Sequence, residues 1–222
     1  MLNYLGQDWA CSFELPLSGG DKDDHYHEFK STKGGDAPIN LAVKFQIENN
    51  ALVLALFAPY WLVNQTQKSI TYKVDSKHLF HHPESLHTQP FLLSFDPCKV
   101  SRTNKLCLSV NQSQFTDFFP LNVVPYTGTF LPQSANKKYN LYVGVQAELA
   151  LIGMSKIITV SSFYNVFNIS KKNIEYSENG RDWATITSQS SKAFFPQKTS
   201  DQTMCFRFAG TKIASMVRRR LP

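Results

Sequence analysis

The amino-acid sequence predicts an all-β fold built from tandem β-sandwich-like repeats. Aromatic residues make up 13% of the chain, with 17 Phe and 9 Tyr, and such residues favour strands over helices. Several segments alternate apolar and polar residues, and no segment sustains a 3.6-residue period with capping residues at its ends. One stretch recurs after roughly 100 residues, which indicates modules that pack on their neighbours.

Composition limits the class of protein. The chain has 222 residues, and its 42% apolar content is enough for a packed core, whereas 18% charged residues is low for a disordered chain. The net charge is +6, and Arg218, Arg219 and Arg220 supply three of these charges. The body is therefore only mildly basic, and we expect no nucleic-acid partner.

The strands are expected in the following order. A short strand-like stretch lies within 1–18, and the polar segment 19–40, with two Gly-Gly pairs, is expected to be a loop. Residues 41–47 alternate between apolar and polar side chains, as in a half-buried strand. The later strand candidates are 69–74, 90–95, 105–110, 141–151 and 204–208.

The most apolar run in the chain extends from Ala51 to Val63 and contains no charged residue. It is too short to cross a bilayer, which needs about 20 such residues. Pro59 argues against a single buried helix, because proline removes a backbone donor and clashes with the preceding turn. Two short strands that meet at a bend or bulge at Pro59 are expected instead.

This run recurs later in the sequence. With a constant offset of 104 residues, Tyr60 falls on Tyr164 and Asn64 falls on Asn168. The segment 41–48 matches 141–148 at an offset of 100, so about four residues are inserted between the two matches. We therefore divide the chain into three parts: 1–50, the C-terminal part of one repeat plus a loop; 51–152, a complete repeat; and 153–222, the N-terminal part of the next repeat with a basic tail.

The segment 58–66, Ala-Pro-Tyr-Trp-Leu-Val-Asn-Gln-Thr, closely resembles a signature of the vacuolar protein sorting-associated protein 13 family of bridge-like lipid transfer proteins. The stretches 90–95, 104–110 and 115–129 extend this resemblance, which covers about residues 5–208. Gln65 and Gln67 stand where the family usually has Lys and Gly. The resemblance implies a fragment of the family's adaptor-binding region, whose β-rich repeats each carry a characteristic Asn.

The resemblance also implies a function. The chain would be a non-catalytic interaction module that binds short proline-containing peptides of membrane-anchored adaptor proteins. It would be cytoplasmic and peripheral at organelle membranes (Golgi, endosome or mitochondrial contact sites), with indirect membrane association and with lipid handled by other parts of the parent protein. An extended peptide can add to an exposed strand edge, with pockets for alternate side chains.

Five residues are candidates for adaptor binding or for organising the repeat: Tyr60, Trp61, Asn64, Tyr164 and Asn168. Asn64 and Asn168 follow apolar strands and precede residues with hydroxyl groups. We expect their side chains to satisfy backbone groups at a turn. Direct contact with an adaptor and glycosylation are the alternatives.

Cysteines and glycosylation sequons raise a rival hypothesis, a secreted β-sandwich binding domain. The four cysteines are scattered, at Cys11, Cys98, Cys107 and Cys205, and the three sequons begin at Asn64, Asn111 and Asn168. The N-terminus lacks the basic flank and apolar core of a signal peptide. We therefore favour a cytosolic chain with free thiols.

The sequence suggests neither a cofactor nor a catalytic centre. His78, His81, His82 and His87 lie close together, but no cysteine or acidic residue stands beside them at a standard zinc spacing. The acidic cluster at 21–24 lacks the spacing of a calcium-binding loop. No motif with a nucleophile and its base, and no phosphate-binding loop, is present, so we expect no enzyme, metal or cofactor.

Overall fold

The fold is given by a computed structural model of the chain. The structure describes residues 1–14, 25–34, 38–73, 79–82, 89–93, 105–121, 123, 125–130, 143–150, 154–196 and 202–219. The regular elements of these residues are twenty β-strands, β1 to β20, which confirms the predicted all-β class. The described residues include no helix that is long and apolar enough to span a membrane.

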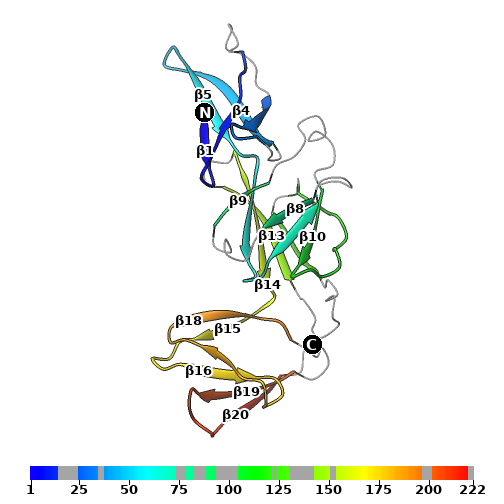
Figure 1. Cartoon of the computed structure of the whole chain (residues 1–222), viewed down its shortest axis with the longest axis vertical. Helices are drawn as coiled ribbons and strands as arrows, with labels where there is room; N and C mark the ends of the chain where they lie inside the picture. The colour runs from blue at the N-terminus through cyan, green and yellow to red at the C-terminus, as the bar shows by residue number, and fades with distance from the viewer. Residues whose placement is uncertain are drawn as a thin grey trace.

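The strands form three bodies that follow one another along the long axis of the molecule (Figure 1). The first body is an antiparallel sheet with the strand order β1-β2-β3-β4-β5. Its strands are β1 (Leu2–Tyr4), β2 (Gln7–Ala10), β3 (His25–Ser31), β4 (Ile39–Glu48) and β5 (Ala51–Phe57).

The middle body consists of two sheets with a shared core. One sheet has the order β12-β13-β14-β6-β9, with β12 (Tyr126–Phe130), β13 (Val143–Leu149), β14 (Lys156–Ser162), β6 (Tyr60–Gln65) and β9 (Phe91–Leu92). The other has the order β11-β10-β7-β8, with β11 (Phe119–Pro120), β10 (Lys105–Val110), β7 (Ile70–Lys73) and β8 (Leu79–His82). Apolar side chains of both sheets, including Leu62, Leu108 and Ile158, are completely buried between them. The body is a β-sandwich, as the repeat pattern predicted.

The third body also contains two sheets. β15 (Tyr164–Asn168) pairs with β18 (Ser190–Phe194), and the second sheet has the order β17-β16-β19-β20. The strands of this second sheet are β17 (Ala184–Ile186), β16 (Ile174–Ser177), β19 (Gln202–Phe208) and β20 (Ser215–Arg219). Tyr176, Ile186 and Phe194 form a small core between the sheets.

The predicted repetition is confirmed strand for strand. The succession β5, β6, β7 recurs as β14, β15, β16, and the break between β5 and β6 contains Pro59 as expected. Residue pairs recur as well, since Ile70 pairs with His82 and, 104 positions later, Ile174 pairs with Ile186. Two residues connect β4 to β5 and six (150–155) connect β13 to β14, so the four inserted residues lie in this hairpin.

One sequence-based prediction is wrong. Within the segment 19–40, which was expected to be a loop, residues 25–31 form β3, which pairs with both β2 and β4. The ring of His27 stacks on Phe13 with 4.5 Å between centroids, and His25 lies 6.0 Å from the ring of Phe45. The imidazoles therefore take the place of apolar side chains, which hid the strand pattern from the alternation analysis.

The sequence predicted a division of the chain into 1–50, 51–152 and 153–222. The chain passes from one sheet to the next at different residues. β5 hydrogen bonds to β4 of the first sheet, and β14 closes the middle body by pairing with β13 and β6. The changes of sheet thus fall between β5 and β6 and between β14 and β15. The limits of the repeats stay a proposal.

The buried hydroxyl of Tyr72 leads to a first prediction. Tyr72 is fully buried on β7, and its hydroxyl has no hydrogen-bond partner among the described residues. Replacing Tyr72 by Phe removes an unpartnered polar atom at nearly constant volume. We expect the free energy of unfolding to rise by about 1 kcal/mol at neutral pH, measured by urea denaturation. Tyr4→Phe is the control with the opposite sign, because the Tyr4 hydroxyl accepts a hydrogen bond from the Leu92 amide at 2.7 Å.

The same tyrosine predicts a pH dependence. Burial raises the pKa of Tyr72 far above its ordinary value, and the neighbouring Tyr4 adds to this shift. Because the pKa of Tyr72 is higher in the folded than in the unfolded chain, only the unfolded chain readily loses this proton as the pH rises above about 10, and the folded state is destabilised from that pH upward. Tyr72→Phe should therefore unfold less readily than the wild type above that pH. If the free energy of unfolding fell equally in Tyr72→Phe and in the wild type above that pH, ionisation of Tyr72 would not be the cause of the alkaline destabilisation.

Candidate functional site

Asn64 stands at the end of β6, and its side chain is completely buried. The Nδ2 group donates to the carbonyl oxygen of Lys68 at 2.7 Å. The Oδ1 atom accepts hydrogen bonds from the Thr66 amide at 3.0 Å and from the Thr66 hydroxyl at 2.7 Å. One side chain thus holds both ends of the turn between β6 and β7, as an Asn at a turn is able to do.

Asn168 repeats this arrangement in the third body. Its Nδ2 donates to the carbonyl of Lys172 at 2.9 Å, and its Oδ1 accepts from the amide and the hydroxyl of Ser170 at 3.0 and 2.7 Å. Nδ2 also donates to the carbonyl oxygen of Thr187 at 2.8 Å. Thr187 lies between β17 and β18, so this hydrogen bond links the turn after β15 to the connection between those two strands. Both amide groups are buried and engaged, so neither can carry a glycan in this fold.

The turn after Asn64 also contacts the third body. Gln67 has a φ of 57°, a left-handed conformation that favours glycine, which is the residue the resemblance leads one to expect at this position. Its side-chain Oε1 accepts a hydrogen bond from the Ala193 amide on β18 at 3.2 Å. The glutamine therefore provides a contact between bodies that a glycine could not make.

The junction between the first two bodies has a counterpart of this contact. There the amide of Leu92 on β9 donates to the hydroxyl of Tyr4. Leu92 pairs with Trp61 and Ala193 pairs with Asn165, and these two partners are 104 positions apart. At each junction a side chain of the preceding body accepts a hydrogen bond from a backbone amide of the next body. The donating strands, β9 and β18, occupy equivalent places, because β9 pairs with β6 and β18 pairs with β15. These hydrogen bonds connect neighbouring bodies.

The predicted aromatic residues separate into two groups. Tyr60 belongs to the middle core, with the Lys156 ammonium 5.5 Å from its ring centroid, and burial lowers the pKa of that lysine. Tyr164 packs against Phe194 beside the core of the third body. Trp61 lies on the other face of β6, with its ring in an edge-to-face contact with Tyr4 at 6.3 Å. Trp61 lines a groove.

This groove lies at the junction of the first and middle bodies and has a volume of about 620 Å³. It is largely apolar, and we call it the Trp61 groove. Its lining residues are Tyr4, Leu5, Trp61, Val63, Gln89, Pro90, Ala150, Ser155 and Ile157. Burial raises the pKa of the Tyr4 hydroxyl, although the hydrogen bond from the Leu92 amide acts in the opposite direction. An apolar groove with two aromatic side chains is suited to binding an extended peptide.

Sequence reasoning identified Trp61 but missed the other walls of the groove. Tyr4 and Leu5 come from the first hairpin, and Ile157 comes from β14. β14 reaches the groove because it pairs in parallel with β6, with Ile157 opposite Trp61. A period-2 pattern identifies each strand but does not say which strands become neighbours.

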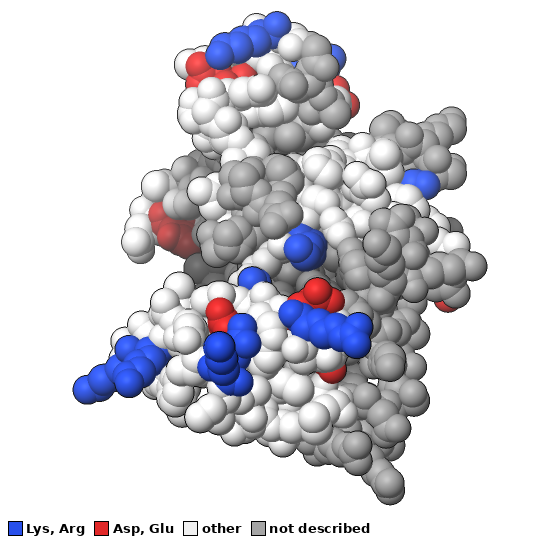
Figure 2. Space-filling view, turned by 60° about the horizontal axis from the view of Figure 1, so that its bottom comes forward, with Lys and Arg blue, Asp and Glu red and all other residues white. Residues whose placement is uncertain are grey.

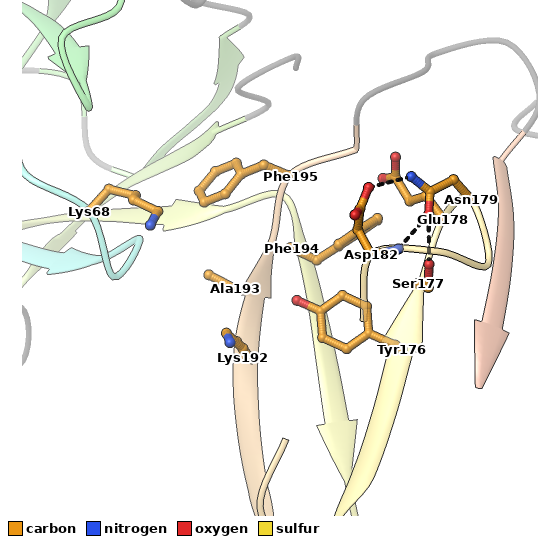
Figure 3. A pocket seen from close by; sticks show the side chains of 10 residues that line it. All are labelled: Lys68, Tyr176, Ser177, Glu178, Asn179, Asp182, Lys192, Ala193, Phe194 and Phe195. Atoms are coloured by element: carbon orange, nitrogen blue, oxygen red, sulfur yellow. Dashed lines mark hydrogen bonds between the residues drawn. The ribbon is translucent and has the colours of Figure 1, made fainter. Parts of the chain in front are cut away.

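A second, smaller cavity of about 320 Å³ lies between the turn before β7 and the third body. Figure 3 shows Lys68 on one side of it and Tyr176 with Phe194 on the other. The hydroxyl of Ser177 donates to Asn179, whose Nδ2 donates to Asp182 at 2.7 Å. The lining of this cavity includes both aromatic and charged side chains, and the cavity was not predicted from the sequence.

The described residues give no sign of a metal site. They include no group of three or more His, Cys, Asp or Glu side chains that could hold an ion. His81 instead lies 3.2 Å from the Thr71 hydroxyl, and His82 is buried, whereas His78, His87 and the segment 21–24 lie outside the described residues. Cys11, Cys107 and Cys205 carry free thiols, and Cys98 is not among the described residues.

Charged side chains do not form a continuous basic surface on the visible face. Figure 2 shows Lys and Arg side chains spread over the end of the molecule formed by the third body, with acidic side chains beside some of them. Glu175 pairs with Arg207 in this body, and the guanidinium of Arg207 lies 3.9 Å from the ring centroid of Trp183. This face differs from the single-sign basic stripe typical of nucleic-acid-binding domains.

Comparison with known proteins identifies the family. Residues 12–215 match the family model of the vacuolar-sorting associated protein 13, adaptor binding domain. The chain belongs to this family. The VPS13 assignment confirms the resemblance seen in the segment 58–66, and the matched region includes both Asn64 and Asn168.

Relatives agree with this assignment. The chain is 30% identical over 203 residues to the intermembrane lipid transfer protein VPS13A of Mus musculus, covering 90% of this chain. It is 27% identical over 227 residues to the intermembrane lipid transfer protein VPS13C of Homo sapiens, covering 97% of this chain. In both comparisons the chain spans 6% of the length of the relative.

Proposed function

We propose that the chain is a non-catalytic module that binds adaptor proteins through short proline-containing peptides. The observation that supports this proposal is the Trp61 groove, which is apolar, carries two aromatic side chains and lies inside a domain of the adaptor-binding family. Proline-rich peptides lose little conformational entropy on binding, and their rings pack well against Trp and Tyr. The side chains of Tyr4, Trp61 and Pro90 would receive the peptide.

Asn64 and Asn168 take a different role in this proposal. Their buried amides bind the backbone of their own turns, so they organise the repeat and do not touch the peptide. Asn64 directly follows Val63, a lining residue of the groove. Tyr60 and Tyr164 act through packing in the same way, which leaves Trp61 as the predicted site residue that contacts the adaptor.

The location of the parent protein follows from this binding. The relatives are named intermembrane lipid transfer proteins. We propose that membrane-anchored adaptors hold this module at the cytoplasmic face of organelles (Golgi, endosome or mitochondrial contact sites), while other parts of the parent handle lipid. Membrane association is then indirect, with no role for nucleic acid, metal or cofactor. The buried sequon residues Asn64 and Asn168 speak against the alternative of a secreted binding domain.

Peptide binding can be tested by fluorescence anisotropy with labelled synthetic Pro-x-Pro peptides and matched peptides in which both prolines are alanine. We expect Trp61→Ala to weaken binding of the proline peptides roughly tenfold or more, as expected for a central aromatic anchor. Because Trp61 also contacts Tyr4, Val63→Asp provides a second test that keeps both rings.

Trp183→Ala is the matched control, since Trp183 lies in the third body against Arg207 and away from the groove. It should bind the peptides as the wild type does. Equal affinity for proline and alanine peptides, or unchanged binding by both groove variants, would contradict the proposal.

A further inference from the structure

The cavity of about 320 Å³ between the turn before β7 and the third body, which we call the Tyr176 cavity, has a counterpart at the other junction of the molecule. That counterpart lies between the first and middle bodies, has a volume of about 270 Å³ and is lined by Tyr72, the residue 104 positions before Tyr176. Among the described residues its lining contains no charged side chain, whereas two lysines and two acidic residues line the Tyr176 cavity. The two cavities thus share a tyrosine and differ in charge.

The two tyrosines also differ in what surrounds their rings. Tyr72 is 0% exposed, and its ring stacks on Phe80, the residue with which it pairs, at 5.1 Å between centroids. The residue that pairs with Tyr176 is Ala184, so the neighbouring strand supplies no ring there. Tyr176 is 8% exposed, and its hydroxyl has no hydrogen-bond partner within the described part of the chain. A nearly buried phenol therefore faces the cavity with an unused donor.

Two lysines stand near this hydroxyl. Lys192 takes the place that Phe91 has in the middle body, because their strand partners are 104 positions apart. Lys68 comes from the turn between β6 and β7, so the two ammonium groups belong to different bodies. Among the described residues neither forms an ion pair. In Figure 3 the Tyr176 hydroxyl points toward the side of the cavity on which both lysines lie. These three donors are suited to an anion.

The opposite side of the cavity is negative. Glu178 and Asp182 lie there, in the turn between β16 and β17 (Figure 3). Oδ2 of Asp182 accepts a hydrogen bond from Asn179 at 2.7 Å, and a carboxylate has capacity for further donors. Burial raises the pKa of Tyr176, and Glu178 adds to this shift, so the phenol keeps its proton at neutral pH. The lining is thus positive on one side and negative on the other, which complements a ligand with both charges.

We propose that the Tyr176 cavity binds a small phosphate monoester that carries an amine, with its phosphate on the lysine side and its ammonium group on the carboxylate side. A phosphate monoester carries about 1.5–2 negative charges at neutral pH and three acceptor oxygens. Two ammonium groups and one phenol match both numbers. A carboxylate has one charge and two oxygens, so it would leave part of this donor set unused.

The ligand would connect two bodies, because Lys68 belongs to the middle body and the other lining residues belong to the third. The backbone amide of Ala193, which also lines the cavity, donates to Oε1 of Gln67 at 3.2 Å across the same junction. Binding should therefore slow hydrogen exchange at the Ala193 amide. This site lies apart from the Trp61 groove and does not depend on peptide binding.

Isothermal titration calorimetry with phosphoethanolamine tests the ligand class. Ethyl phosphate lacks the amine, ethanolamine lacks the phosphate, and β-alanine has a carboxylate in place of the phosphate. We expect each to bind roughly tenfold or more weakly than phosphoethanolamine. Vesicles of phosphatidylcholine with and without phosphatidylethanolamine separate the soluble monoester from a lipid headgroup. Binding to the phosphatidylethanolamine vesicles without binding of phosphoethanolamine would overturn the proposal, as would equal affinity for phosphoethanolamine and β-alanine.

Tyr176→Phe and Lys68→Gln should each weaken phosphoethanolamine binding roughly tenfold, because each removes one donor to the phosphate. The repeat supplies a matched control for both variants. Tyr72→Phe changes the equivalent tyrosine in the uncharged cavity. Lys172→Gln changes the lysine 104 positions after Lys68, whose ammonium lies 5.7 Å from the ring centroid of Phe208. Both controls should bind as the wild type does, and equal losses in variants and controls would overturn the proposal.

Asp182→Asn tests the amine side separately. The new side chain keeps an oxygen that can accept from Asn179, so the turn is preserved. It should weaken binding of phosphoethanolamine and leave ethyl phosphate unchanged or more tightly bound, because a negative charge is removed. An equal effect on both compounds would contradict the orientation. Unchanged exchange at Ala193 on saturation with phosphoethanolamine would show that the ligand does not connect the two bodies and would overturn the assignment to this cavity.

Discussion

Replacing Ile158 by alanine is expected to lower the free energy of unfolding by about 2–5 kcal/mol, the cost of a large buried aliphatic side chain and the cavity it leaves. Ile158 is completely buried on β14, where it pairs with Leu62 on one side and Ala147 on the other. The loss therefore affects three neighbouring strands of the sheet. Guanidinium denaturation followed by far-ultraviolet circular dichroism measures it.

Leu54→Ala provides the matched comparison, because Leu54 occupies the same position of the repeat on β5. Its side chain is exposed, so the same truncation should cost less than about 1 kcal/mol at protein concentrations where the chain is monomeric. The difference between the two variants measures what a parallel neighbour contributes at one repeat position. Equal costs would show that β5 and β14 have equivalent surroundings in solution, which would contradict the strand order described above.

The sequence predicted the strands where burial follows a simple period. β4, β10 and β13 were expected from the alternation of apolar and polar residues, and the constant offset of 104 residues correctly paired β6 with β15. The hydrogen bonds of Asn64 and Asn168 agree with the turn role expected for these residues. These features are local, since each depends on residues within a few positions of one another.

Long-range pairing could not be predicted in this way. The parallel contact of β14 with β6 joins Ile157 to Trp61, and nothing in either strand alone specifies that neighbour. The Trp61 groove also needs Tyr4, which the fold brings near through the first hairpin. β3 was missed because His25 and His27 pack as aromatic rings although their sequence pattern is polar. Sequence reasoning thus found one wall of the groove and the fold supplied the others.

Replacing Asn64 by alanine is expected to destabilise the middle body by about 1–3 kcal/mol, because buried partners lose their hydrogen bonds. The Thr66 amide and the Lys68 carbonyl would both lose the Asn64 side chain. Hydrogen exchange should report this loss directly, with faster exchange at Thr66 and Lys68 and through β6. Asn173→Ala is the control, because its side-chain oxygen accepts one backbone amide, that of Ser188, at an exposed site.

Peptide binding should weaken in Asn64→Ala together with the loss of exchange protection, since Val63 next to it lines the Trp61 groove. If the whole destabilisation fell on the groove, the affinity would decrease by up to roughly a hundredfold. Asn173→Ala should leave both exchange near β6 and peptide binding unchanged. If Asn64→Ala kept wild-type exchange at Thr66 and yet abolished peptide binding, Asn64 would be a contact residue, and the repeat-organising role would be wrong. The paired measurements therefore separate the two roles, because a fully buried amide can influence the peptide only through the backbone that it holds.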